Sequence, residues 1–362
     1  MTYETERRVA IETVLRACRL CQSVRATLVT ADAMAKKDKS PVTVADFGAQ
    51  AIVSHDLAAA FPGDPLVGEE HAGDLAGTAG AAIKAGVVRS VRAIAPELDE
   101  PRILTAISRG THAGGARGRF WTLDPIDGTK GFLRGEQYAV ALALIEGGVP
   151  VLGVLGCPNL PLDATRPDAA AGCLFVAVRG QGAFLRRVLD AATERAAIER
   201  AATERAATVR ERSNDRSTDP RPADGETPVR VSAIADPAGA VFCESVESAH
   251  SKHDDSAEVA RRLGVMSPPY RIDSQCKYAA VARGDASIYL RLPTRADYEE
   301  KIWDHAAGWM VVTEAGGTVT DVTGKPLDFA LGRTLRANKG VVATNGRIHA
   351  PVIAAVRQVL RA

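Results

Sequence analysis

Apolar residues recur at helical spacing in the first third of the chain. Between residues 4 and 29 they lie among charged residues at intervals of three and four, which predicts an amphipathic helix. Residues 42–44 follow a Ser-Pro pair and are expected to form a short extended segment or turn. A second helical pattern begins at Asp46 and ends before Phe61. Two further helices are predicted over residues 83–94 and 101–107.

Short apolar runs predict strands in the middle of the chain. Residues 138–145 are almost continuously apolar, as expected for a buried strand, and a Gly-Gly pair then turns the chain. Successive strands without intervening helices favour an antiparallel sheet. The strands expected here cover residues 66–67, 120–123, 138–145, 149–155, 174–178 and 183–185.

From residue 229 onward, strand and helix patterns alternate, which predicts a smaller α/β domain. Its strands are expected at residues 229–231, 241–243, 270–272, 286–292 and 318–322. Its helices are expected at residues 256–263, 276–283, 303–312 and 348–360. Asp304 is expected to cap the third of these helices. We therefore divide the chain into an N-terminal α+β domain, residues 1–235, and a C-terminal α/β domain, residues 236–362.

The composition changes between residues 186 and 228. A ten-residue near-repeat fills residues 191–200 and 201–210, and a polar tail follows it. Two copies are too few for a solenoid, so we interpret the segment as a low-complexity insertion in a surface connection, partly helical and partly disordered. A segment that binds a partner protein is the alternative.

Composition and charge exclude several classes of function. The chain has 362 residues, which is long enough for two domains. Its net charge of +1 argues against a protein that binds a nucleic acid polymer, because such proteins usually carry an excess of positive charge. No apolar run approaches the roughly 20 residues of a membrane span. The acidic start lacks the apolar core of a secretory signal, so we expect a cytoplasmic location, with an organelle left open. Cys18 and Cys21 are expected to be buried thiols, with a redox or metal pair as alternatives.

Two carboxylates three residues apart follow the strand predicted at residues 120–123. Asp124 and Asp127 flank a Pro-Ile pair, and Gly128 and Thr129 come next. An isolated Asp-x-x-Asp-Gly is more often a turn. A strand that ends in this way also offers two carboxylates, the Ile126 carbonyl and a hydroxyl, which is the oxygen-only set that Mg²⁺ prefers.

Three more acids stand where elements are predicted to begin or end. Glu69 follows the short strand at residues 66–67, and Asp46 and Asp304 stand at predicted helix starts. Taken singly, each is more often a surface residue or a cap. Together with Asp124 and Asp127, these acids supply what a metal-dependent phosphatase needs, namely several acids from separate segments and a water activator.

The sequence resembles a known family at several motifs. Three of them, in chain order, are typical of the inositol monophosphatase superfamily: Gly68-Glu-Glu70, Asp124-Pro-Ile-Asp-Gly-Thr129 and Trp303-Asp-His-Ala-Ala307. Longer strings resemble its 3′(2′),5′-bisphosphate nucleotidase branch: Ser40-Pro-Val-Thr-Val-Ala-Asp-Phe-Gly-Ala-Gln50, Asp127-Gly-Thr-Lys-Gly-Phe-Leu-Arg-Gly-Glu-Gln137, Asp273-Ser-Gln-Cys-Lys-Tyr278, Tyr289-Leu-Arg-Leu-Pro293 and Glu300-Lys-Ile-Trp-Asp304. The resemblance covers nearly the whole chain except residues 186–228.

The resemblance implies a layered α/β/α/β/α fold and a role for each matching residue. Two or three Mg²⁺ ions would be held by Glu69, Asp124, Ile126 (through its carbonyl), Asp127 and Asp304. Glu70 is the weaker ligand candidate. Asp46 and Thr129 would together activate the attacking water. The substrate contacts implied are Thr129, His250, Ser274, Lys277, Arg291 and Asp304, with His253 as an alternative to His250.

The activity implied is removal of the 3′-phosphate from adenosine 3′,5′-bisphosphate, which gives AMP and phosphate. Adenosine 3′-phosphate 5′-phosphosulfate is the expected second substrate, and inhibition by lithium and a monomeric state are expected. Two alternatives remain at this stage. One is a phosphatase of inositol phosphates with the same catalytic set, and the other is a non-catalytic sensor of the bisphosphate nucleotide.

Overall fold

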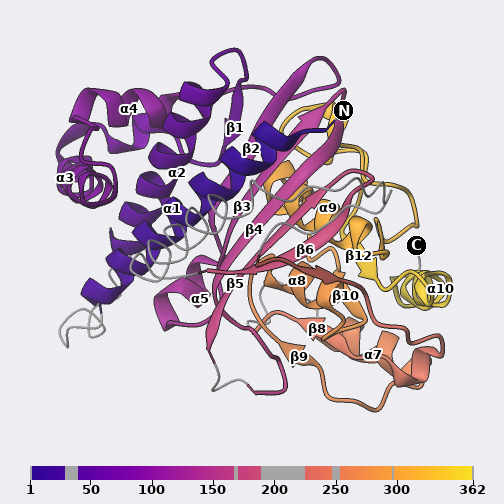
Figure 1. Cartoon of the computed structure of the whole chain (residues 1–362). Coiled ribbons are helices and arrows are strands. Elements are labelled where there is room, and N and C mark those ends of the chain that lie inside the picture. The colour runs from indigo at the N-terminus through magenta and orange to yellow at the C-terminus, as the bar shows by residue number, and fades with distance from the viewer. Residues whose placement is uncertain are drawn as a thin grey trace, which may run out of the picture.

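The computed structural model describes residues 2–28, 40–166, 170–188, 225–246, 253–295 and 297–360. Within these residues, two β-sheets are separated and covered by helices (Figure 1). Three buried apolar clusters fill the spaces between the layers. The resulting order is α/β/α/β/α, which confirms the predicted fold class.

The larger sheet contains seven strands that follow one another in chain order. They are β1 (Leu66–Gly68), β2 (Arg119–Asp127), β3 (Ala139–Glu146), β4 (Val149–Pro161), β5 (Ala171–Val178), β6 (Gly182–Arg187) and β7 (Thr227–Val229). Strand β1 pairs with β2 in parallel, and the other pairs are antiparallel. The antiparallel sheet expected from the apolar runs is therefore confirmed, apart from its first strand.

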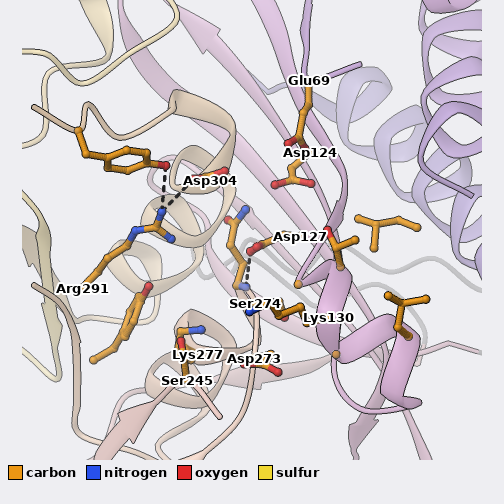
Figure 2. A pocket seen from close by; sticks show the side chains of 18 residues that line it. Glu69, Asp124, Asp127, Lys130, Ser245, Asp273, Ser274, Lys277, Arg291 and Asp304 are labelled. Atoms are coloured by element: carbon orange, nitrogen blue, oxygen red, sulfur yellow. Dashed lines mark hydrogen bonds and ion pairs between the residues drawn. The ribbon is translucent and has the colours of Figure 1, made fainter. Parts of the chain in front are cut away.

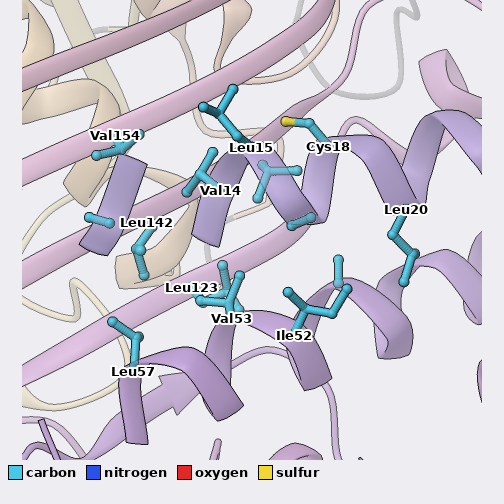
Figure 3. Packing of buried hydrophobic residues seen from close by; sticks show 14 of the residues in the cluster. Val14, Leu15, Cys18, Leu20, Ile52, Val53, Leu57, Leu123, Leu142 and Val154 are labelled. Carbon is cyan, nitrogen blue, oxygen red and sulfur yellow. The ribbon is translucent and has the colours of Figure 1, made fainter. Parts of the chain in front are cut away.

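Alternation along the strands divides the side chains of this sheet between two cores. Leu123 and Leu142 point toward the N-terminal helices, whereas Phe120 and Ala141 pack on the opposite face. Figure 3 shows the first of these cores, where residues such as Val14 meet the sheet. The helices on this side are α1 (Glu4–Leu28), α2 (Ser40–Ala60), α3 (Gly77–Ile94) and α4 (Glu100–Ser108), with a 3₁₀ turn at Ala72–Leu75.

The smaller sheet has five strands in the order β11-β12-β10-β8-β9. They are β8 (Phe242–Glu244), β9 (Tyr270–Arg271), β10 (Ile288–Arg291), β11 (Thr318–Thr320) and β12 (Val341–Thr344). Helices α8 (Cys276–Arg283) and α9 (Ala306–Glu314) lie between the two sheets, and α7 (His253–Arg262) and α10 (His349–Leu360) cover the outer face. Both α8 and α9 are almost wholly buried because each packs against a sheet on two sides.

Two local predictions at helix starts were wrong. Helix α2 begins at Ser40, so residues 42–44 are helical and Asp46 lies in the second turn. A proline is tolerated in the first turn, because the N–H that it lacks would have no helical partner there. Asp304 ends a 3₁₀ turn (Ile302–Asp304) and is not the N-cap of α9, which begins two residues later.

The predicted insertion is described only at its ends. Arg186 and Arg187 belong to β6, and Thr227 and Pro228 to β7, and these two strands pair with each other. The ends of the segment assigned to the insertion are therefore part of the sheet. Residues 189–224, which hold the near-repeat and most of the polar tail, lie outside the described residues.

The six cysteines are all free and buried, as predicted for Cys18 and Cys21. Burial raises the pKa of Cys18 to about 12. Thiols of this kind are inert at neutral pH, because the thiolate is the reactive form. In the part of the chain that the structure describes, no helix is both long and apolar enough to cross a membrane.

Candidate active site

A cavity of about 470 Å³ opens between the end of β2, helix α5 (Thr129–Arg134), helix α8 and strand β10 (Figure 2). Nine residues predicted from the sequence line it: Glu69, Asp124, Ile126, Asp127, Thr129, Ser274, Lys277, Arg291 and Asp304. They come from both sheets and from the helical layer between them. The fold thus brings together side chains that are more than two hundred residues apart in the sequence.

The Asp-Pro-Ile-Asp corner is a bulged end of strand β2. Asp124 pairs with Ala141 and Asp127 with Ala139, so three steps on β2 face two on β3. The chain then leaves the strand through Gly128, which has a φ of +88°. A Cβ at Gly128 would lie 2.7 Å from the Cβ of Ser274, so this corner requires a glycine.

Carboxylates crowd one wall of the cavity. Asp124 is 3% exposed, and its Oδ1 has no hydrogen-bond partner. Burial, reinforced by the charge of Glu69, raises the pKa of Asp124 well above its usual range. Desolvation, followed by the charge of Asp304, raises the pKa of Glu69 to about 8 and that of Asp127 to about 6. Acids that repel one another and a buried oxygen without a partner are what a divalent cation would stabilise, so the residues fit Mg²⁺.

The loop before helix α8 fixes one of these acids. The backbone N–H of Gln275 donates to Oδ2 of Asp127 at 2.5 Å. Ser274, one residue earlier, has a φ of +66°, a conformation that non-glycine residues rarely adopt. Because Ser274 also packs against Gly128, the tight turn places the α8 loop directly on the corner.

Two cations, Lys277 and Arg291, line the cavity across from Asp124 (Figure 2). Lys277, on the first turn of α8, is buried, and its Nζ lies 5.3 Å from the centre of the Tyr289 ring. Arg291, at the end of β10, contacts Glu300 through Nε at 2.7 Å and Asp304 through Nη2 at 3.3 Å. Burial lowers the pKa of Lys277, although the charge of Asp127 opposes this effect.

Asp46 lies behind the acidic wall. It is 7% exposed, and burial, followed by the charges of Glu70 and Glu69, raises its pKa well above the usual range. Helix α2, which carries Asp46, contacts helix α5, whose first residue is the exposed Thr129. Burial, followed by the charge of Asp74, raises the pKa of Glu70 to about 7. The charge of Glu70 in turn contributes to the raised pKa of Asp46.

A second group of possible ligand atoms adjoins the cavity. Glu300, Asp304 and His305 place theirs within 4.8 Å of one another. All three side chains already have partners. His305 Nε2 lies 3.1 Å from Glu300 and His305 Nδ1 lies 2.7 Å from the hydroxyl of Tyr278, while Asp304 contacts Arg291. We therefore interpret this group as a hydrogen-bonded support for Arg291 and Asp304.

Sequence reasoning missed several residues that hold the site together. Gln275 accepts from Gly308 N at 3.0 Å and donates to the carbonyl of Trp303 at 2.9 Å. Gln275 and Glu300 lie within two of the motifs that carry the family resemblance, so the sequence did contain a signal that could have pointed to them. Arg333 lies outside these motifs, and no pattern pointed to it. His250 lies outside the described residues.

Comparison with known proteins places the chain in a family over its whole length. A model described as the inositol monophosphatase family matches residues 2–361. The chain belongs to the inositol monophosphatase family. A solved inositol monophosphatase from Anabaena (Nostoc) shares the fold, with a TM-score of 0.59 and 20% identity over 99% of this chain and 97% of that one.

Within the family, curated relatives are named as nucleotidases. The 3′(2′),5′-bisphosphate nucleotidase of Emericella nidulans is 45% identical, over 100% of both chains. That of Schizosaccharomyces pombe is 41% identical, over 99% of this chain and 97% of its own. The 3′(2′),5′-bisphosphate nucleotidase 1 of Arabidopsis thaliana is 43% identical over the same shares. The resemblance predicted from the motifs is therefore confirmed.

Proposed function

We propose that the protein is a 3′(2′),5′-bisphosphate nucleotidase. It removes the 3′-phosphate of adenosine 3′,5′-bisphosphate to give AMP and phosphate, and it acts also on adenosine 3′-phosphate 5′-phosphosulfate. One observation carries the proposal: the same cavity is lined by the acids Asp124 and Asp127 and by the cations Lys277 and Arg291. A substrate with two anionic groups suits both, since the acids can hold metal ions at one phosphate while the cations receive the other.

The proposed metal site is the acidic wall, with two or three Mg²⁺ ions. Its ligands are Glu69, Asp124, the Ile126 carbonyl, Asp127 and Asp304. When bound, Mg²⁺ supplies positive charge that stabilises the attacking water and the leaving oxygen. The raised carboxylate pKa values and the unpartnered Oδ1 of Asp124 support this assignment.

The proposed water activator is the pair Asp46 and Thr129. The Asp46 carboxylate accepts the threonine proton, and the Thr129 hydroxyl oxygen then takes a proton from the attacking water. The contact between helices α2 and α5 supports the pairing. Ser274, Lys277 and Arg291 are proposed to contact the nucleotide, together with Thr129, Asp304 and, from the sequence alone, His250.

Phosphate release from three substrates in the presence of Mg²⁺ tests the proposal. Adenosine 3′,5′-bisphosphate should be hydrolysed far faster than inositol 1-phosphate or inositol 1,4-bisphosphate, with AMP as the nucleotide product by chromatography. Asp124→Asn should abolish release while retaining the shape of the side chain. Release from the inositol compounds alone, or adenosine 3′-phosphate as the product, would contradict the proposal. Tight nucleotide binding without release would favour a sensor.

The compartment and the oligomeric state are part of the same proposal. We place the enzyme in the cytoplasm as a monomer, in line with its free cysteines, which a reducing compartment preserves. Light scattering during size-exclusion chromatography should give the mass of one chain, and twice that mass would contradict the monomer.

A further inference from the structure

Arg333 reaches the end of strand β1 from the C-terminal half of the chain. Its Nη2 donates to the carbonyl of Gly68 at 2.6 Å. Its Nη1 donates to the carbonyls of Gly110 and His112 at 3.1 and 3.0 Å. Gly68 immediately precedes Glu69, the first residue of the acidic wall, so this guanidinium holds the peptide unit from which Glu69 projects.

The same side chain also holds a second part of the wall. The guanidinium carbon of Arg333 lies 4.9 Å from the centre of the Trp303 ring, and the backbone carbonyl of Arg333 accepts from Ile302 N at 3.1 Å. Trp303 immediately precedes Asp304. One residue therefore contacts the neighbours of two acids that lie on separate segments of the chain.

The Glu69 segment is held from its other side as well. The side chain of Gln50, on helix α2, accepts from Glu70 N at 3.0 Å and donates to the Glu70 carbonyl at 2.7 Å. Gln50 fixes this segment to the N-terminal helices, whereas Arg333 fixes it to the segment that carries Asp304. Gln50 and Arg333 thus hold the Glu69 segment from two sides.

The contacts of Arg333 are typical of a residue that positions main-chain segments, and they differ from those of an ion pair. Among the described residues, no carboxylate lies within ion-pair distance of it, and its donors point to main-chain carbonyls. The planar guanidinium can bridge several carbonyls and stack on an indole at once, which a lysine ammonium cannot do. Residues that orient metal ligands typically change metal affinity when they are replaced.

We propose that Arg333 is a positioning residue for the metal centre and sets Glu69 and Asp304 at the distance that Mg²⁺ requires. This inference shares one element with the proposed function, namely that Glu69, Asp124, Asp127 and Asp304 form the metal site. It does not depend on which phosphate ester is the substrate.

Direct metal titration tests the inference. Mn²⁺ binding, followed by electron paramagnetic resonance of the free ion, is compared between the wild-type protein and Arg333→Met, Arg333→Lys and Arg336→Met. Arg336 is exposed on the same loop and is the matched control. Arg333→Met should weaken Mn²⁺ binding about 10-fold or more, Arg333→Lys by a smaller factor, and Arg336→Met not at all. Binding by Arg333→Met within about two-fold of wild type would overturn the inference.

Two further measurements distinguish an effect on metal binding from an effect on folding or on nucleotide binding. Circular dichroism at the titration temperature establishes that each variant is folded, and Arg333→Lys serves if Arg333→Met does not fold. In the hydrolysis assay, Arg333→Met should need more Mg²⁺ for half-maximal rate, while KM for the nucleotide at saturating Mg²⁺ stays near wild type. A change in nucleotide KM alone would contradict positioning of the metal. A wild-type protein that binds Mn²⁺ but hydrolyses no nucleotide would contradict only the proposed substrate.

Discussion

Asp127 offers a measurable consequence of crowding acids in the cavity wall. Desolvation and the charge of Asp304 raise its pKa to about 6, although Lys277, Arg291 and the N–H of Gln275 act in the opposite direction. Replacement by asparagine removes the charge and keeps an oxygen that can accept the bond from Gln275. We expect Asp127→Asn to stabilise the metal-free protein and to abolish its activity.

The size of the effect follows from proton linkage. The pKa of Asp127 rises from its ordinary value of 3.8 in the unfolded chain to about 6 in the folded protein, and each pKa unit corresponds to about 1.36 kcal/mol. The unfolded chain therefore loses this proton first as the pH rises, so ionisation favours unfolding between these two values. The cost is absent below pH 4 and complete, at up to about 3 kcal/mol, above pH 6. With about 2.1 cal/mol/K of unfolding entropy per residue, Asp127→Asn should raise Tm by about 4 °C at pH 8.

Differential scanning calorimetry in EDTA at pH 8 and at pH 4 measures this difference. Asp297→Asn is the control, since the Asp297 side chain is 83% exposed and its only described ion-pair distance is 3.8 Å. Added Mg²⁺ should raise Tm of the wild type and have much less effect on Asp127→Asn. The reasoning is refuted if Asp127→Asn lowers Tm at pH 8 in EDTA, or if the difference is the same at both pH values.

Three further predictions concern the same cavity. Gly68→Ala would put a Cβ 2.5 Å from Oε1 of Gln50. The free energy of unfolding, measured in urea, should therefore fall by about 1–3 kcal/mol, and kcat should fall by at least about 10-fold. Gly63→Ala, where the new Cβ meets nothing within 4 Å, should change neither quantity. Lys277→Met should raise KM for adenosine 3′,5′-bisphosphate about 10–100-fold through loss of a charge-assisted bond, and an unchanged KM would remove Lys277 from the nucleotide site. Because the pKa of Glu69 is raised to about 8, Mg²⁺ binding at pH 7 should release protons and strengthen as the pH rises; equal calorimetric heats in buffers of different ionisation enthalpy would contradict this.

Much of the architecture was readable from local patterns. Apolar runs gave six of the seven strands of the larger sheet, and helix α8 was predicted with the bounds that the structure has. The strand predicted at residues 229–231 was assigned to the smaller domain, which was wrong, because β7 (Thr227–Val229) pairs with β6 in the larger sheet. The errors at helix starts had two causes, a tertiary contact in one case and a local rule applied too strictly in the other. Asp304 has the sequence context of an N-cap, but it ends a 3₁₀ turn and its carboxylate faces Arg291. The Ser40-Pro41 pair suggested a break, yet helix α2 begins there, since a proline costs little in a first turn.

The sequence by itself determined which residues could do the chemistry. The carboxylates of the corner, the acids elsewhere and the motif strings are properties of residue identity and order, and they were sufficient to predict the family and the candidate ligands.

Only the tertiary structure decided how these residues act on one another. Whether Glu69 lies near Asp304 depends on the order of the strands and on the packing of layers far apart in sequence, and the pKa values depend on burial and mutual repulsion that no local pattern contains. Arg333 illustrates the limit most clearly. An arginine in a loop is usually a solvated surface residue, and only the folded chain brings its guanidinium to the carbonyl of Gly68 and the ring of Trp303.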